Sequence, residues 1–313
     1  MEPRNQSAMR EAISAMILTM VGGIVATMIP YTGILIYFAA AIFFLASRKI
    51  GFIITLPYVI AAYVFMGIFT DFASAIFDVL APAIIAIVMG ELSRLQRSQG
   101  EVLAKGMLLG LLFTFLSITT ARIISGVSLW ESSSQFISLA IQDAMIAGQL
   151  TQEAADLMMQ MYEALLLVVP ALLIIWSTVM VLFIYYFGAY LFRKQGGVIE
   201  KYFPFRSIGF SPGVVTGFLL ISIGGVIAVY AGIVAENVML YNLLLIGYFI
   251  FALQGMAVVT FFCMWLKVPK ILFAAIVLLL FISTIGVLIL PIIGMLDILF
   301  HFRARISGQG DAK

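Results

Sequence analysis

The sequence has little charge, one cysteine and one histidine. Only 10% of its 313 residues are charged, and the formal net charge is +2. Cys263 and His301 stand alone, which excludes an intrachain disulfide and a metal centre built from several His or Cys ligands. The basic residues lie in short separate segments and form no patch of the kind that binds nucleic acid. We therefore expect no metal, no cofactor and no nucleic-acid partner.

Signatures of catalysis are also missing. Gly294 to Asp297 read Gly-Met-Leu-Asp, which differs from the Gly-x-Gly-Asp pattern of intramembrane aspartyl proteases. There is no Gly-x-Ser-Gly and no phosphate-binding Gly-x-x-x-x-Gly-Lys-[Ser/Thr] loop. Glu91 and Arg94 are best explained as a charge pair at a helix end. The sequence predicts that the protein is not an enzyme and has no catalytic residues.

Apolar residues dominate the composition of the chain. The chain is 64% hydrophobic with a mean hydropathy of +1.17, which is typical of an all-α polytopic membrane protein in contact with the lipid bilayer. No signal-peptide cleavage site follows the polar N-terminus, so we expect the first helix to be retained. Apolar runs long enough, or nearly long enough, to cross a bilayer lie at about 12–29, 33–46, 52–69, 74–90, 104–127, 163–192, 213–234, 238–266 and 271–290. We expect nine spans, or eight if the short run 33–46 is re-entrant.

Lysine and arginine are distributed asymmetrically around these runs. With the N-terminus inside, 13 of the 17 Lys and Arg lie in cytoplasmic segments and the opposite loops have none. This predicts a multi-pass protein of the bacterial cytoplasmic (inner) membrane with cytoplasmic loops 47–51, 91–105, 193–212 and 267–270. Nine crossings would put the basic tail outside, so either the tail tolerates that side or one segment does not cross.

We expect one integral membrane domain, 1–313, with an external helical segment at 128–162. It separates the first five spans (1–127) from the last four spans and the tail (163–313). Ser132 to Ser134 predict the cap of an amphipathic helix that Gly148 terminates, lying on the membrane or over the bundle. Thr151 predicts the cap of a second helix, which continues into the sixth span past Pro170. In the next inside loop, Ser211 and Pro212 predict the start of the seventh span.

Polar residues within apolar runs are candidates for functional sites, because a polar side chain in a membrane helix must bind another polar group or face a water-filled cavity. Asp78 and Arg122 predict either a buried ion pair or a substrate or proton site. Asn237 and Asn242, next to Glu236, predict the rim of an outward-facing cavity. Gln254 is explained at least as well by an interhelical hydrogen bond as by ligand contact.

Two glycine pairs place small residues on one helix face, Gly106 with Gly110 and Gly213 with Gly217. Such faces let helices approach closely. We expect static packing inside the bundle, and a moving contact or an oligomer interface is the alternative.

The C-terminal quarter carries a resemblance. Asn242-Leu-Leu-Leu-x-Gly-Tyr-Phe-x-Phe-x-Leu-Gln254-Gly255, then Pro269, then Gly294-x-x-Asp297-x-x-Phe300-x-Phe302-Arg303 resemble the YybS-like family of predicted bacterial membrane proteins, a domain of unknown function. That family is similar in helix arrangement to the substrate-capture subunits of energy-coupling-factor vitamin transporters. The resemblance implies a coupling membrane subunit that contacts a small-x-x-x-small face near the first helix, here Ala8 with Ala12 or Gly22 with Ala26.

Two functions fit these patterns. The first is a transporter-like bundle that captures a small molecule or lipid group, with Asp78, Arg122, Asn237 and Asn242 as candidate ligand-binding residues. Because it has no nucleotide-binding motif, it would need a partner ATPase or an ion gradient for uphill transport. The alternative is a scaffold or signalling protein that binds other membrane proteins without transport.

Overall fold

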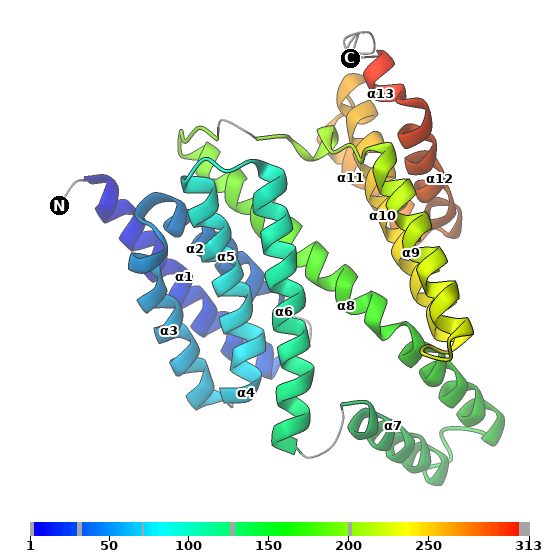
Figure 1. Ribbon diagram of the computed structural model, residues 1–313. Helices are drawn as coiled ribbons and strands as arrows, with labels where there is room; N and C mark the ends of the chain where they lie inside the picture. Colours follow the sequence, from blue (N-terminus) through cyan, green and yellow to red (C-terminus); the bar gives the residue numbers. More distant parts are fainter. Residues whose placement is uncertain (1–2, 30–32, 71, 126–128, 200–201, 307–313) are drawn as a thin grey trace. The chain divides into compact units, whose positions relative to one another are not determined.

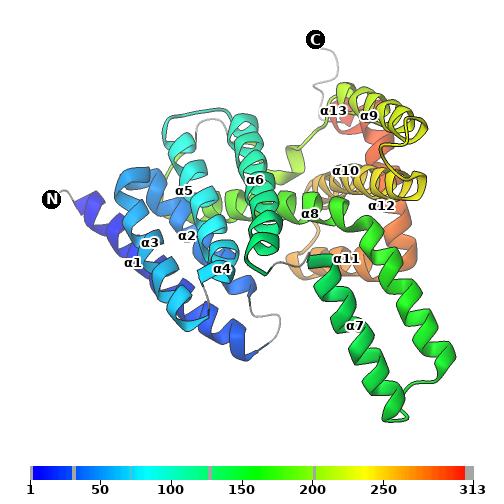
Figure 2. The same ribbon diagram turned by 60° about the horizontal axis from the view of Figure 1, so that its bottom comes forward.

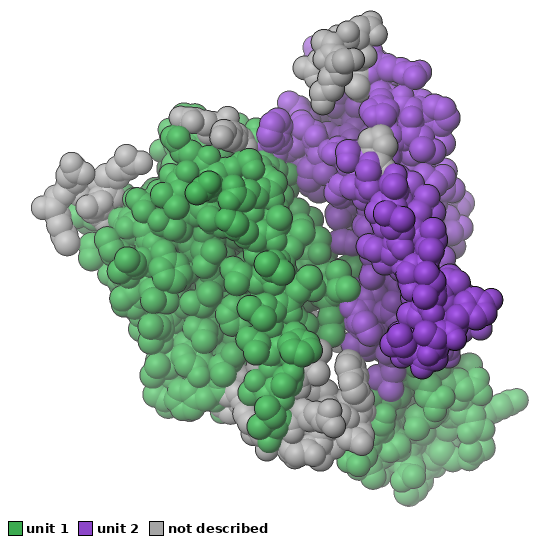
Figure 3. Space-filling model, viewed as in Figure 1, with its two compact units in different colours: residues 1–163, 173–202 green, residues 164–172, 203–313 purple. Residues whose placement is uncertain are grey.

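The computed structural model describes residues 3–29, 33–70, 72–125, 129–199 and 202–306. Within these ranges the protein is all-helical and has no strand. The chain divides into two compact units, coloured separately in Figure 3. Unit 1 comprises residues 1–163 and 173–202, and unit 2 comprises residues 164–172 and 203–313.

Figures 1 and 2 show the helices in chain order. The first half contains α1 (Pro3–Met28), α2 (Ile34–Ile50), α3 (Phe52–Phe69), α4 (Phe72–Ala75), the π-helix η1 (Ile76–Leu80), α5 (Ala81–Arg94), α6 (Gln99–Ser125) and α7 (Leu129–Ile146). The second half contains α8 (Gln152–Lys194), the 3-10 turn η2 (Phe205–Ser207), α9 (Pro212–Tyr230), α10 (Glu236–Trp265), α11 (Lys270–Ile282), α12 (Thr284–Phe300) and α13 (Phe302–Ile306).

Nine spans are not confirmed. Among the described residues, α1, α3, α6, α8, α9 and α10 are long and apolar enough to cross a membrane, and α11 with α12 makes a seventh if the bent pair counts as one. The run 33–46 became the 17-residue α2, and 74–90 is interrupted by η1. The run 271–290 is broken at Ser283, where the chain bends by 100°. Ser283 is extended there, and its hydroxyl accepts a hydrogen bond from the Gly286 N–H, so the serine ends one helix and caps the next.

Several local signals are confirmed. Thr151 caps α8 by accepting a hydrogen bond from the Ala154 N–H, and α8 continues unbroken past Pro170. Pro212 begins α9, and Gly148 after α7 has a φ of +70°. The predicted serine cap of α7 is wrong, because this helix begins at Leu129, before the serines.

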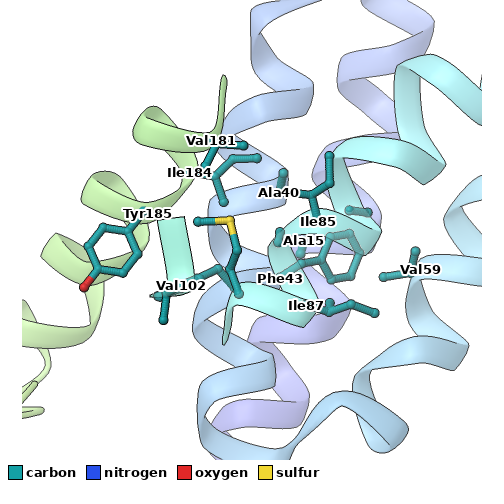
Figure 4. Close-up of a cluster of buried hydrophobic side chains, with 14 residues drawn as sticks. Ala15, Ala40, Phe43, Val59, Ile85, Ile87, Val102, Val181, Ile184 and Tyr185 are labelled. Carbon is teal, nitrogen blue, oxygen red and sulfur yellow. The ribbon is translucent and has the colours of Figure 1, made fainter. Parts of the chain in front are cut away.

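The core of unit 1 forms where α2, α5, α6 and the last part of α8 pack together (Figure 4). Phe43, Ile85 and Tyr185 are almost completely buried in it. Gly106 lies against Met89 and Val181, so a larger residue there would collide with them. A Cβ on Gly110 would overlap the Ser177 hydroxyl. This glycine pair of α6 therefore faces the interior of unit 1.

The strongest contact of unit 2 is between α10 and α12, which run in the same direction. Tyr248 donates a hydrogen bond to the Val287 carbonyl, and further along both helices Gln254 donates one to Asp297. Between these points Gly255 and Gly294 bring the two backbones together. A Cβ on Gly255 would overlap the Leu290 carbonyl oxygen, and one on Gly294 would overlap the Phe251 carbonyl oxygen. The crossing point therefore admits only glycine at both positions.

Candidate functional site

Unit 1 contains a cavity of about 530 Å³, a volume within the range of small-molecule sites. Its wall comes from the end of α1, the start of α2, the end of α3, η1 and α8. The polar and aromatic members of this wall are Thr27, Tyr37, Thr70, Asp78 and Trp176. We call this cavity the α1–α3 pocket.

The pocket lies at one end of the unit 1 helices, and a charged cluster lies at the other. Lys49 at the end of α2 forms an ion pair of 2.6 Å with Glu11 in the first part of α1, and it also donates a hydrogen bond to Gln195. Thr27 is 16 residues after Glu11 on the same helix, hence about 24 Å along the axis. The pocket and the basic segments thus belong to opposite ends of the bundle, which fits the predicted outward-facing cavity.

The charged end also includes a pair predicted from sequence. Arg94 donates hydrogen bonds of 3.0 and 2.6 Å to the Glu91 carboxylate, which confirms the helix-end charge pair. Glu91 also accepts a hydrogen bond from the Phe52 N–H. The Arg94 hydrogen bond is the main reason that the pKa of Glu91 is lowered, and desolvation opposes it. This acid therefore stays ionised and ties α5 to the start of α3.

Asp78 reaches the pocket from the π-helix η1. A π-helix has wider turns than an α-helix, so it rotates the residues that follow it, and such segments recur at functional sites. The Asp78 side chain is exposed among the pocket-lining residues. Arg122 belongs to α6, and its side chain lies outside the described residues. The Asp78–Arg122 ion pair therefore stays a prediction.

The side-chain donors of the pocket wall are largely used within the protein. The hydroxyl of Thr27 donates to the Ile24 carbonyl, and that of Thr70 donates to the Met66 carbonyl. Tyr37 and Trp176 meet edge to face, with ring centroids 5.7 Å apart. The rest of this wall is apolar or aromatic apart from Asp78.

Asn242 was predicted at the cavity rim, and its amide bonds to α8. Its Nδ2 donates to the Leu167 carbonyl at 2.6 Å, and its Oδ1 accepts from the Ala171 N–H at 2.7 Å. These backbone groups flank Pro170, which has no N–H of its own and disturbs the helix. The amide also donates to Val238, so its donors and its acceptor are used inside unit 2.

The four predicted ligand residues are divided between the units. Asp78 and Arg122 belong to unit 1, whereas Asn237 and Asn242 belong to unit 2. Asn237 is exposed near the start of α10. The prediction that all four residues line one cavity is therefore not tested. Of the four, only Asp78 is among the described residues that line the α1–α3 pocket.

Gln254 belongs to a buried polar network in unit 2. Its Nε2 donates to Asp297 at 2.7 Å, and its Oε1 accepts from the Phe210 N–H at 3.1 Å. Asp297 also accepts two hydrogen bonds from the Arg303 guanidinium, which donates a further one to the Arg206 carbonyl. The Asp297 and Arg303 side chains are 4% and 11% exposed. We call this set the Gln254–Asp297–Arg303 network, and it joins α10, α12, α13 and the segment before α9.

The second predicted glycine face is placed differently from the first. A Cβ on Gly217 of α9 would have no atom within 4 Å, and one on Gly213 would meet only Ser211. Near the first helix, Ala8 and Ala12 are fully buried and Gly22 lies against Leu35. The first of those two small-x-x-x-small pairs is therefore not exposed to a coupling partner, whereas in the second pair Gly22 is packed and Ala26 is half-buried in the pocket wall.

The comparison with protein families agrees with these features. The profile of DUF2232, described as predicted membrane protein, matches residues 17–298. The chain belongs to this family. No curated protein and no solved structure matches it. The residues that carried the family resemblance include Asn242, Gln254, Gly255, Gly294, Asp297 and Arg303, which hold unit 2 together through the contacts above.

Sequence reasoning missed Tyr37, Trp176 and the role of Asp297. Tyrosine and tryptophan near the ends of apolar runs are ordinary interfacial residues, so neither stood out. Their pairing joins positions 139 residues apart, which no spacing pattern reveals. Asp297 was considered only against the aspartyl-protease pattern and within the family motif, although a lone acid at the end of an apolar run is itself a signal for a buried partner.

Proposed function

We propose that this membrane protein binds a small molecule or a lipid head group in the α1–α3 pocket. The observation that carries the proposal is the pocket itself, which combines a volume of about 530 Å³ with Asp78 and the Tyr37–Trp176 pair in a mainly apolar wall. Ligand sites of membrane transporters have this composition, because a few oriented polar groups in an apolar wall give specificity.

In this proposal the protein captures its ligand from the side opposite the basic segments and does not alter it chemically. The sequence has no nucleotide-binding loop, so movement of the ligand would depend on a partner ATPase, a coupling membrane subunit or an ion gradient. The proposed location is the bacterial cytoplasmic membrane with a cytoplasmic N-terminus, supported by the distribution of Lys and Arg.

One observation favours the scaffold alternative. A Cβ on Gly217 or Gly224 of α9 would meet no atom within 4 Å, and this helix has no buried residue in the stretch Gly213–Tyr230. Such a face suits close packing against another membrane helix. Partners that co-purify without any bound small molecule would favour this alternative.

A pocket-filling variant tests the proposal. Gly33 lines the pocket, and a Cβ there would meet no atom within 4 Å, so Gly33→Leu should place its side chain in the pocket without a clash. Gly224→Leu on α9 is the matched control, because it adds the same side chain at another open position. Mass spectrometry after gentle detergent purification should find a small molecule on the wild type and the control but not on Gly33→Leu. Equal retention by all three proteins, or no bound molecule on any, would refute the proposal.

A further inference from the structure

A second cavity lies in unit 2, within the hairpin that α9 and α10 form (Figure 1). It has a volume of about 470 Å³, and its described lining residues all belong to these two helices. Only Ser222, Tyr230 and Glu236 among them have a hydroxyl group or a charge. Ser222 donates its hydroxyl proton to the Phe218 carbonyl one turn earlier, at 2.8 Å. The wall along the helices is therefore apolar, and we call this cavity the α9–α10 groove.

The groove begins at the end of the hairpin that suits the lipid head groups. Both helices are long and apolar enough to cross a membrane. Glu236 at the start of α10 would be costly in hydrocarbon, and Tyr230 at the end of α9 is 89% exposed, as is usual for tyrosine at a membrane interface. From Tyr230 the groove follows α9 to Phe218, twelve residues earlier, which corresponds to about 18 Å. One leaflet of hydrocarbon is about 15 Å deep, so the groove has the depth of one leaflet.

An acyl chain suits this groove better than a polar solute does. A polar solute would find no hydrogen-bond partner along the apolar wall, and burying it there would cost free energy. A concave wall contacts a chain on several sides, whereas a flat helix surface contacts it on one, so dispersion favours the groove over the surrounding surface. In the stretch Gly213–Tyr230, α9 has no buried residue, so a chain can reach the groove from the lipid.

The charge at the groove end selects among head groups. Glu236 is the only charged residue between Arg206 and Lys267 in the sequence, so the hairpin has no basic residue at that end. An anionic head group would be repelled there, because a negative charge on the protein and one on the lipid would lie close together at the membrane surface. A zwitterionic head group that ends in an ammonium group avoids this repulsion.

We propose that the α9–α10 groove binds an acyl chain of a zwitterionic phospholipid whose ammonium-bearing head group lies at Glu236. This site is separate from the α1–α3 pocket, because its described lining residues all belong to unit 2. The lipid site therefore does not depend on the proposed function of the α1–α3 pocket.

Native mass spectrometry of the full-length protein in a mild detergent tests the lipid class. Phosphatidylethanolamine and phosphatidylglycerol with identical palmitoyl and oleoyl chains differ only in the head group. We expect phosphatidylethanolamine to bind more tightly by about fivefold or more, and Glu236→Gln should bring the two affinities within about twofold. Dihexanoyl phosphatidylethanolamine, which has the same head group on short chains, should bind more weakly by about tenfold or more.

A groove-filling variant tests the location. Val226 lines the groove, so Val226→Trp should place an indole ring in it and weaken the binding of phosphatidylethanolamine by about tenfold or more. Ile227→Trp is the matched control, because Ile227 is the next residue of α9, is 63% exposed and is not among the lining residues. It should bind the lipid like the wild type. Melting curves verify that each variant is folded, and Ser222→Leu fills the groove from a second position if Val226→Trp does not fold.

Four outcomes would overturn the proposal. Wild-type affinity in both Val226→Trp and Ser222→Leu would place the bound lipid outside the groove. Equal affinity for the long-chain and the dihexanoyl lipid would show that the chain is not recognised. Phosphatidylglycerol bound as tightly as phosphatidylethanolamine, or more tightly, would contradict the role of Glu236. A dimer without lipid that Val226→Trp dissociates would make the groove an interface between two copies of the chain. The Gly33→Leu comparison tests the α1–α3 pocket separately from all four.

Discussion

The buried charges of unit 2 are stable only together. Asp297 accepts hydrogen bonds from Gln254 and from Arg303, and the guanidinium is held in turn by the Arg206 carbonyl. When one member of such a network is removed, the other charge stays buried without compensation, which costs more than the pair itself contributes. The Gln254–Asp297–Arg303 network therefore acts as a single structural element.

Asp297→Ala should lower the free energy of unfolding in detergent by about 3–5 kcal/mol, because it leaves the Arg303 charge buried. The double variant Asp297→Ala with Arg303→Leu should lose less than the sum of the single variants. Glu101→Ala is the control, since its ion pair with Lys105 is largely exposed and should contribute less than about 1 kcal/mol. Equal losses for Asp297→Ala and Glu101→Ala, measured by denaturant titration, would show that the network does not stabilise unit 2.

Asn242 forms hydrogen bonds with two backbone groups of α8 next to Pro170. Replacing it with leucine of similar size removes the partners of the Leu167 carbonyl and the Ala171 N–H, which should cost about 1–3 kcal/mol. In a Pro170→Ala background these two groups can form the ordinary helical hydrogen bond with each other. Asn242→Leu should therefore be less destabilising in that background. Identical effects in both backgrounds, measured by thermal unfolding, would contradict this role.

At the scale of elements, glycine determines which helices meet. The backbones of α10 and α12 touch at Gly255 and Gly294, where added Cβ atoms would overlap carbonyl oxygens. Neither backbone can shift as a flexible side chain would, so the helices would have to separate. That separation would also lengthen the hydrogen bond between Gln254 and Asp297.

Gly294→Ala should destabilise the protein by at least about 1–3 kcal/mol, the usual result of overpacking a tight contact. Gly224→Ala makes the same chemical change at a helical position with no atom within 4 Å of the added Cβ. It should be neutral or stabilising by up to about 1 kcal/mol, because alanine favours the helix. Thermal melts of both variants in one detergent give the comparison. A neutral Gly294→Ala would mean that the helices are further apart than described.

At the scale of the whole chain, the parallel course of α10 and α12 determines where the tail emerges. Since both helices run in the same direction, α11 must bring the chain back before α12 returns. The tail then leaves on the side where α10 ends, whether or not α11 crosses completely. Arg303 is hydrogen-bonded to the Arg206 carbonyl, so α13 also lies beside the segment before α9. We therefore expect the basic tail on the same side as the basic loops.

Cysteine labelling tests this topology in a Cys263→Ala background. With an impermeant maleimide on intact spheroplasts, Leu150→Cys should react, and Lys267→Cys and Arg305→Cys should react only after lysis. If positions 267 and 305 react alike, α12 ends on the same side of the membrane as α10. The contrast with position 150 tests which side of the membrane is cytoplasmic. If Arg305→Cys reacted in intact spheroplasts, as Leu150→Cys should, α12 would end on the opposite side of the membrane from α10. Reversal of all three results would keep the return but invert the orientation.

Features that depend on neighbouring residues can be predicted from the sequence alone. Hydropathy gave the membrane class and the helical fold, and Thr151, Gly148 and Pro212 marked helix ends, because capping and proline geometry act within one turn. The sequence also identified Asp78, Asn242 and Gln254 as polar residues that needed an explanation. The predicted nine spans were not confirmed, because hydropathy over 74–90 and 271–290 could not reveal the π-helix or the bend at Ser283.

The pairing of groups that are distant in the sequence depends on how the helices pack. The bonds from Asn242 to Leu167 and from Gln254 to Asp297 join positions 75 and 43 residues apart. The pocket needs Tyr37 and Trp176 from separate helices. Two glycine pairs with the same spacing also differ: Gly106 and Gly110 are packed, whereas Gly217 has no neighbour within 4 Å. Spacing along one helix defines a face, but the partner of that face depends on the packing of the other helices, which a single sequence does not specify.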